Sequence, residues 1–167
     1  ESDVAADPSL WLRSMRDNGV TIWNSAPQLL KMLLVHASSA GTPVPASLRL
    51  ALLSGDWIPK DLPKEARDML PGLWVVSLGG ATEASIWSVL HEIAGDYPDV
   101  PSIPYGNAMK KQKMYVLNEA FEPCPEWVPG DLYIGGVGLA VGYWRDEEKT
   151  QAAFVVNPES GERLYRT

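Results

Sequence analysis

The chain has 167 residues, 46% of them hydrophobic and 21% charged, which is the composition of a globular protein and not of a disordered one. Its formal net charge is −7, with 21 acidic side chains against 14 lysines and arginines, which argues against a protein that binds nucleic acid. One cysteine and two distant histidines exclude a disulfide framework and a multi-cysteine metal site, and no apolar run could span a membrane, so we expect a cytoplasmic protein with no membrane partner.

Helix and strand patterns alternate over the first half of the chain. Asp7 followed by Pro8 predicts the start of a helix with the aspartate as N-cap, and Gly19 predicts its end. Ser25 predicts the N-cap of a second helix, and Asp61 that of a third. The periodicity indicates helices over 8–18, 26–40 and 62–70, and strands over 20–23, 48–53 and 73–76, the second of them buried on both faces.

The alternating order of these elements predicts a parallel sheet joined by right-handed crossover connections. In open parallel sheets, ligands bind beyond the carboxyl ends of the strands. Those ends are expected at Asn24, at Ser54 and Gly55, and at 78–80. Three separate stretches of the chain should therefore converge on one ligand site.

The stretch 77–88, SLGGATEASIWS, follows the third predicted strand and is the main candidate for chemistry. Gly79 and Gly80 allow a turn that most residues cannot make. Thr82 and Glu83 then offer a hydroxyl and a carboxylate, which suit a phosphate with a divalent cation. An ordinary tight connection with a polar pair has the same pattern, so this stretch alone leaves both interpretations open.

The second half of the chain lacks helical periodicity from residue 98 until Asp146, and it predicts a small antiparallel β unit. Strands are expected over 113–117, 132–134 and 163–166, and a helix capped by Asp146 over 147–154. The glycines of 135–142 fit no phosphate-loop spacing and indicate tight turns. The expected fold class is α/β, with a parallel sheet flanked by helices followed by this small antiparallel β unit.

Three stretches in register resemble the adenylate-forming enzymes, specifically the amino-acid adenylation domains of nonribosomal peptide synthetases. SLGGATEASIW (77–87) looks like the family's aromatic-Gly-Pro-Thr-Glu motif, GDLYIGGVGLAVGYW (130–144) resembles its Gly-Glu-Leu…Ala-Arg-Gly-Tyr motif, and LYRT (164–167) matches the start of Tyr-Arg-Thr-Gly-Asp. The resemblance implies a partial adenylate-forming (acyl-CoA synthetase-like) fold. Residues 1–97 would then be most of its second α/β subdomain, and 98–167 its small β subdomain with the return to the first.

The chain lacks several features that the resemblance implies. The family's phosphate loop, its amino-acid-binding and ribose-binding aspartates and its catalytic lysine have no counterpart, so we expect a piece of a longer polypeptide that is not catalytically competent alone. Gly79 stands where the family has an aromatic residue that stacks on adenine. Ala81 stands in place of its proline, and Val141 in place of its arginine.

The resemblance also implies roles for individual residues. Glu83 would bind the Mg²⁺ of ATP, and Thr82 would hydrogen-bond the phosphate, as the catalytic residues of this chain. The residues expected to bind ATP are Gly55, Gly79, Gly80, Ala81 and Thr82. The positions that match the family's amino-acid pocket are Asn24, Leu52, Ser54, Leu78, Ile86 and Trp87.

The pocket positions carry no charge, and their apolar members with two polar groups suit a small polarizable thiol better than a charged side chain. The set also looks like the family's cysteine-selecting set, which occurs in synthetases of thiazoline siderophores. The expected function is activation of L-cysteine as aminoacyl-AMP with ATP and Mg²⁺. The aminoacyl group would then pass to the phosphopantetheine of a peptidyl carrier domain, with condensation or cyclization domains as further partners.

Two other interpretations stay open. One is an acyl- or aryl-CoA ligase of the same superfamily. The other is a degenerate, non-catalytic nucleotide-binding module, which the substitutions Gly79 and Val141 favour and the retained Glu83 opposes.

Overall fold

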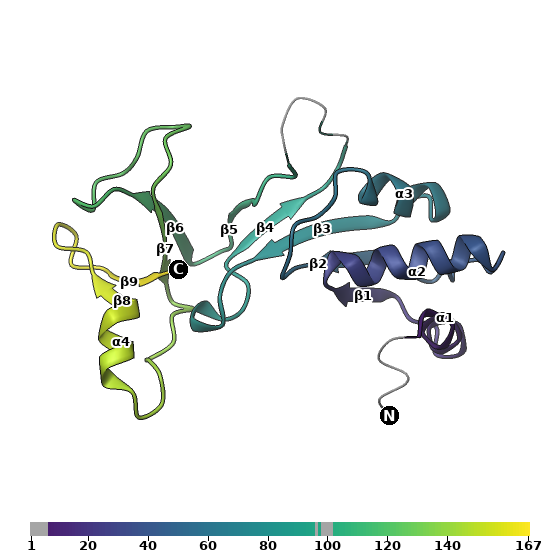
Figure 1. Cartoon of the computed structure of the whole chain (residues 1–167), viewed down its shortest axis with the longest axis horizontal. Helices are drawn as coiled ribbons and strands as arrows, with labels where there is room; N and C mark the ends of the chain where they lie inside the picture. Colours follow the sequence, from purple (N-terminus) through teal and green to yellow (C-terminus); the bar gives the residue numbers. More distant parts are fainter. Residues whose placement is uncertain (1–6, 96, 98–101) are drawn as a thin grey trace. The chain divides into compact units, whose positions relative to one another are not determined.

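A computed structural model describes residues 7–95, 97 and 102–167 of the chain (Figure 1). It divides into two compact units: unit 1 comprises Glu1–Leu78 and His91–Pro104, and unit 2 comprises Gly79–Leu90 and Tyr105–Thr167. The predicted subdomain boundary near residue 97 falls beside residues outside this description, and it stays a prediction about a complete adenylation domain. Within the described ranges, no helix is both long and apolar enough to cross a membrane.

Unit 1 is built on the predicted alternation of helices and parallel strands. Its elements are, in order, α1 (Pro8–Asp17), β1 (Ile22–Ser25), α2 (Pro27–Ser39), β2 (Leu50–Leu53), α3 (Leu62–Met69) and β3 (Trp74–Gly79). β1 pairs with β2, and β2 with β3, all parallel, so that Asn24, Leu52 and Val76 are register partners. The α/β class and the parallel sheet are confirmed.

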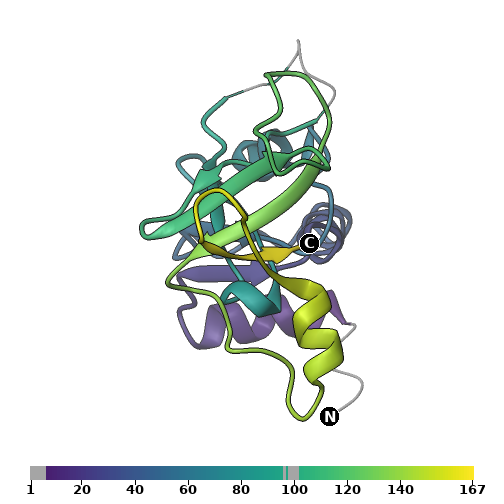
Figure 2. The same cartoon turned by 90° about the vertical axis from the view of Figure 1, so that its left-hand side faces the viewer.

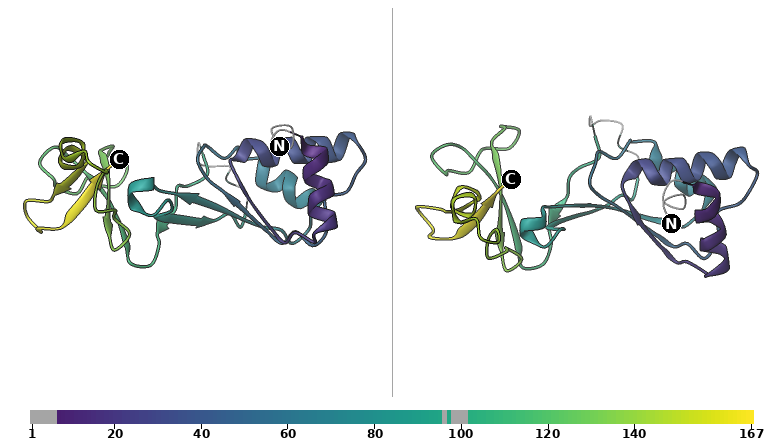
Figure 3. Two further views of the ribbon diagram at one scale, coloured as in Figure 1. Left: turned by 90° about the horizontal axis from the view of Figure 1, so that it is seen from below. Right: turned by 60° about the horizontal axis from the view of Figure 1, so that its bottom comes forward.

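The helices of unit 1 pack on one face of these strands (Figure 3). Side chains alternate between the faces of a strand, and Ala51 and Leu53 of β2 are fully buried with Val75 in the same core as the helices. Leu50 and Leu52 point to the other face and are only partly buried. The expectation that this strand is buried on both faces is therefore wrong for this chain.

The helix starts follow the sequence in only part of unit 1. Asp7 caps α1 as predicted, since its Oδ1 accepts a hydrogen bond from the Ser9 amide at 2.8 Å. Ser25 does not cap α2, because it lies in β1 and its hydroxyl accepts from Trp23 Nε1 at 2.7 Å. The N-cap position of α2 is Ala26, which has no side-chain oxygen to offer.

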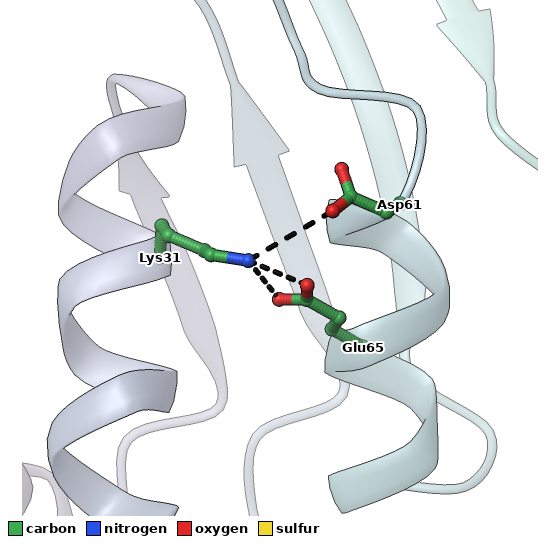
Figure 4. A network of polar contacts seen from close by, with 3 residues as sticks. All are labelled: Lys31, Asp61 and Glu65. Atoms are coloured by element: carbon green, nitrogen blue, oxygen red, sulfur yellow. Dashed lines mark hydrogen bonds and ion pairs between the residues drawn. The ribbon is translucent and has the colours of Figure 1, made fainter.

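Asp61 takes the N-cap position of α3 without a capping hydrogen bond, and its carboxylate faces a lysine of α2 instead (Figure 4). Lys31 Nζ lies 4.0 Å from Asp61 Oδ2 and 2.5 Å from both carboxylate oxygens of Glu65. These side chains are partly exposed, so solvent screens the ion pair and it adds little to the packing of α2 on α3.

Unit 2 contains the predicted small antiparallel sheet (Figure 2). Its described elements after residue 105 are β5 (Asn107–Ala108), β6 (Gln112–Leu117), β7 (Asp131–Gly136), α4 (Glu147–Ala153), β8 (Phe154–Val156) and β9 (Arg163–Arg166). Four of these strands form one sheet in the order β6-β7-β9-β8, and every pair is antiparallel. Asp146 caps α4 as predicted, with its Oδ1 accepting from the Lys149 amide at 3.0 Å.

A short strand that the sequence analysis missed follows the glycine turn. It is β4 (Val89–Glu92), which pairs antiparallel with β5. The described strands outside the four-stranded sheet form one mixed sheet in the order β1-β2-β3-β4-β5. The fold therefore reverses direction at residues 80–88, between the end of β3 and the start of β4.

Candidate functional site

The glycine turn at the end of β3 is a tight reversal that requires glycine. Gly80 has φ +148°, and a Cβ atom there would lie 2.6 Å from both Ile86 O and Ser88 N. The Ser88 amide donates to Gly79 O at 2.7 Å and closes the reversal. Gly79 and Gly80 thus make the turn that the sequence predicted for them. Between the ends of the reversal lies the short 3₁₀ helix η2 (Thr82–Ala84).

Two consecutive residues after η2 have left-handed backbones. Ser85 has φ +63° and Ile86 has φ +67°. A β-branched residue in this region is an outlier, and such conformations persist only where the surrounding structure holds them. Hydrogen bonds do so here: the Ile86 amide donates to Ala81 O at 2.9 Å, and the Ser85 hydroxyl donates to Gly138 O at 2.8 Å. The Ile86 side chain remains 62% exposed.

Glu83 is held by the segment that follows β7. The Tyr143 hydroxyl donates to Glu83 Oε1 at 2.5 Å, and the Ala140 amide donates to Glu83 O at 2.7 Å. Together with the bond from Ser85 to Gly138, these contacts fix 138–143 against η2. Two of the three stretches that carry the family resemblance are therefore in direct contact within unit 2.

Arg163, which opens β9 and directly precedes the third stretch, holds the backbone of the second stretch. Arg163 donates from its two terminal guanidinium nitrogens to Ala140 O at 2.8 Å and Val141 O at 2.7 Å. Its guanidinium carbon lies 4.3 Å from the ring centre of Phe154, in cation–π contact. The backbone at Val141, where the resemblance implies an arginine, is thus held by an arginine from β9. The Val141 side chain is 96% exposed.

The electrostatics of this cluster favour an ionised Glu83. The hydrogen bond from Tyr143 lowers the pKa of the Glu83 carboxyl, burial opposes it, and Tyr165 and Lys149 lower it further. The same hydrogen bond raises the pKa of Tyr143 far above its usual value, because an ionised tyrosine would face an ionised glutamate. At neutral pH the pair is therefore a charged acceptor with a neutral donor.

The surroundings of Glu83 fit a cation that a ligand shares. Among the described residues, no three His, Cys, Asp or Glu side chains cluster as a metal site. Glu83 is a partly exposed and ionised carboxylate in the turn that begins with the exposed Thr82. Mg²⁺ is commonly held by one or two carboxylates, with phosphate oxygens and water supplying the other ligands. The donor set around Glu83 is of this kind.

The other predicted site residues are distributed over both units. Asn24 and Leu52 are register partners, and Leu78 lies two residues beyond their partner Val76, so the alternation of side chains puts these residues on one face of the sheet. This face is opposite to the one that the helices cover. Unit 1 holds Asn24, Leu52, Ser54, Gly55 and Leu78, and unit 2 holds Gly79, Gly80, Ala81, Thr82, Glu83, Ile86 and Trp87. Their roles in binding remain predictions.

The sequence analysis missed the residues that position Glu83. Tyr143 and Tyr165 lie inside stretches that it used only as marks of the family, and Arg163 directly precedes one of them. Tyrosine and arginine are hydrogen-bond donors, so their residue types alone could have marked them as candidates. Their partners could not be predicted, because these lie 60 and about 20 positions away and no local pattern encodes the pairing.

Comparison with known proteins shows the family of the chain. A family model described as "AMP-binding enzyme" matches residues 1–144. The chain is 43% identical over 161 residues to the anguibactin system regulator of Vibrio anguillarum, and 42% identical over 162 residues to the pyochelin synthetase PchF of Pseudomonas aeruginosa. These alignments cover 96% and 97% of this chain but only 15% and 9% of the two relatives.

A solved structure with the same fold is that of FmoA3, a nonribosomal peptide synthetase. It superposes with a TM-score of 0.93 and 45% identity, over 97% of this chain and 18% of that one. FmoA3 has also been solved in an AMPPNP-bound form and in a form bound to α-methyl-L-serine-AMP. The fold of the described units is therefore that of fragments of such synthetases.

Proposed function

Because this chain belongs to the family of AMP-binding enzymes, we propose that it is part of the adenylation domain of a nonribosomal peptide synthetase and that the complete domain activates L-cysteine. The observation that carries this proposal is that the three motif stretches each supply a residue to the cluster around one ionised carboxylate. Glu83 lies in the first stretch, Tyr143 of the second donates a hydrogen bond to it, and Tyr165 of the third lowers its pKa further, all within unit 2.

The proposed reaction joins two anions. A carboxylate oxygen of the amino acid attacks the α-phosphorus of ATP, the bond from that phosphorus to the bridging oxygen breaks, and pyrophosphate leaves. In the second step the thiol of a carrier domain's phosphopantetheine attacks the acyl carbon and displaces AMP. Mg²⁺ would neutralise the phosphate charge that opposes the first step. Glu83 would hold that ion, and the Thr82 hydroxyl would donate to a phosphate oxygen.

Cysteine is the favoured substrate because the predicted pocket residues carry no charge. Leu52, Leu78 and Ile86 are aliphatic, and a hydroxyl costs more to bring against such side chains than a thiol. The names of two relatives link them to pyochelin and anguibactin, which supports a siderophore-type pathway. FmoA3 has been solved with α-methyl-L-serine-AMP, so a hydroxyl-bearing amino acid is the competitor that the test must include.

The test is ATP–pyrophosphate exchange by a complete adenylation domain that contains this chain, measured for each of the twenty amino acids. We expect cysteine to exceed serine by about 10- to 100-fold in kcat/KM, the scale of selectivity in apolar pockets. Ser54→Val should crowd the pocket and lower kcat/KM for cysteine. Ser54→Ala is its matched control, because it removes the hydroxyl without adding bulk, and it should disfavour serine further.

The outcome separates the proposal from its alternatives. Preference for serine or a large aromatic amino acid would overturn the pocket assignment and leave adenylation standing. Exchange driven by carboxylic acids without an amino group would favour the acyl- or aryl-CoA ligase. Absence of both exchange and nucleotide binding would favour the non-catalytic module.

A further inference from the structure

An aromatic ring lies where a side chain at residue 79 would project. A Cβ atom built on Gly79 would be 2.3 Å from Cε2 and 2.4 Å from Cζ of Tyr105. Neither distance is possible for a real side chain, so with this ring in place only glycine fits at 79. Both residues belong to unit 2. The Tyr105 ring can therefore occupy this position only because residue 79 has no side chain.

The backbone fixes the position of Tyr105 relative to the glycine turn. Tyr105 precedes β5, in which Ala108 pairs with Val89 of β4. The Met109 amide donates to Ser88 O at 2.8 Å, and the Ser88 amide donates to Gly79 O at 2.7 Å. A continuous set of main-chain bonds thus connects the chain after Tyr105 with the turn that carries Thr82 and Glu83. These main-chain bonds hold the segment that contains Tyr105 beside the turn.

The Tyr105 ring is also available to a ligand. Its side chain is 51% exposed, although it packs against the Gly79 backbone. Aromatic side chains gain most from burial, and a half-exposed ring against the glycine turn still has apolar surface to cover. A planar base has the matching shape, because every base has a π-face that stacks on aromatic rings without regard to its hydrogen-bonding edge.

We propose that Tyr105 supplies the aromatic face on which the adenine of ATP stacks, in place of a side chain at residue 79. This inference rests on the proposed function. The ring reaches the space beside the turn from the residue two positions before β5, and residue 79 has no side chain that would exclude it. Tyr105 is accordingly a nucleotide-binding residue, and it takes no part in proton transfer or phosphate chemistry.

The test compares two replacements in a complete adenylation domain that contains this chain. Tyr105→Phe keeps the ring, and Tyr105→Leu removes it with most of the apolar bulk retained. Stacking on one base is worth about a fivefold to 100-fold change in affinity. We expect Tyr105→Leu to raise the Kd of AMPPNP, measured by calorimetry, and the KM of ATP by such a factor, and Tyr105→Phe to stay within about threefold of the wild type.

Two inhibitors separate stacking from simple packing on Gly79. Adenosine has the base without phosphate, and pyrophosphate has phosphate without the base. Tyr105→Leu should weaken inhibition by adenosine and leave inhibition by pyrophosphate unchanged. Trp127→Leu is the matched control, since it removes a ring that is 93% exposed in the loop after Pro125, and it should change neither. Should Tyr105→Leu fail to fold, Tyr105→Met provides a flexible apolar replacement for the same measurements.

Each result bears on a different statement. Equal weakening of both inhibitors, or an unchanged Kd for AMPPNP in the variant without the ring, overturns the role of Tyr105 while the proposed function stands. A wild-type domain that neither binds AMPPNP nor catalyses exchange overturns the proposed function, and the role of Tyr105 with it. A selective loss for adenosine supports both.

Discussion

Replacing Tyr143 by phenylalanine should weaken the proposed Mg²⁺ site without removing its proposed ligand, Glu83. The change removes one oxygen, the donor that lies 2.5 Å from Glu83 Oε1, and leaves the ring that packs at 6.0 Å from Phe154. Glu83 keeps its charge and its backbone bond from Ala140. What it loses is the contact that orients the carboxylate.

The magnitude follows from the role of this hydroxyl as a positioning group. At 2.5 Å its hydrogen bond is within the short range for a hydroxyl on a carboxylate. Residues that orient a metal ligand cost about 10- to 100-fold in metal affinity or activity when they are replaced. We expect the Mg²⁺ concentration for half-maximal exchange to rise by about 10- to 100-fold.

The assay is ATP–pyrophosphate exchange by the complete adenylation domain over a Mg²⁺ titration. Tyr115→Phe is a matched control, because the Tyr115 hydroxyl donates to another glutamate, Glu162, at 2.8 Å. It should leave the Mg²⁺ dependence unchanged. Tyr143→Phe should also have little further effect once Glu83 is glutamine, since contacting residues are coupled by about 0.5–3 kcal/mol.

The pH dependence provides a second readout with a defined sign. Tyr143 lowers the pKa of Glu83, so in the wild type the benefit of the ionised carboxylate is lost only as the pH falls through that lowered value. Without the hydroxyl the pKa moves back toward its usual 4.5, and the loss begins at higher pH. An unchanged Mg²⁺ titration, or a cycle in which the two substitutions simply add, would refute the positioning role of Tyr143.

Two further outcomes are expected. Glu83→Gln in the complete domain keeps the shape of the side chain and removes its charge, so exchange should lose about 2–4 kcal/mol of transition-state stabilisation and change its Mg²⁺ dependence; unchanged kinetics would mean that Glu83 is an ordinary surface residue. The isolated 167-residue chain should give no exchange with any amino acid, because it lacks the phosphate loop and the catalytic lysine that position the reactants; sustained turnover by that chain would contradict this expectation.

The elements with a clear period were predictable from the sequence. The alternating helices and strands of unit 1 and the antiparallel strands of unit 2 appear close to their predicted bounds. The errors lie where a tertiary partner overrides a local preference. Ser25 has the chemistry of an N-cap but bonds to Trp23, and Asp61 faces Lys31 rather than the start of its helix. β5 has two residues, too few for any period to show.

The glycine turn of the candidate site was predictable from the sequence, but the residues that hold Glu83 were not. Thr82 and Glu83 follow a glycine turn, which is a local signal, and the turn formed as expected. The partners of Glu83 are Tyr143, in the segment after β7, and Tyr165, in β9, so they depend on tertiary structure that no short window of sequence contains. Tyr105 is of the same kind, since only the pairing of β4 with β5 relates it to Gly79.

The spacing of these partners along the chain has a consequence for protein synthesis. Tyr143 follows Glu83 by 60 residues, and Tyr165 follows later still, in β9. At about 5–20 residues per second, a ribosome needs roughly 3–12 s to proceed from Glu83 to Tyr143. During that interval the nascent chain contains the turn, with its glutamate, and none of the side chains that orient it. The carboxyl acquires its lowered pKa and its fixed geometry only after the segment with Tyr143 has been made, so the candidate cation site matures later than the turn that carries it.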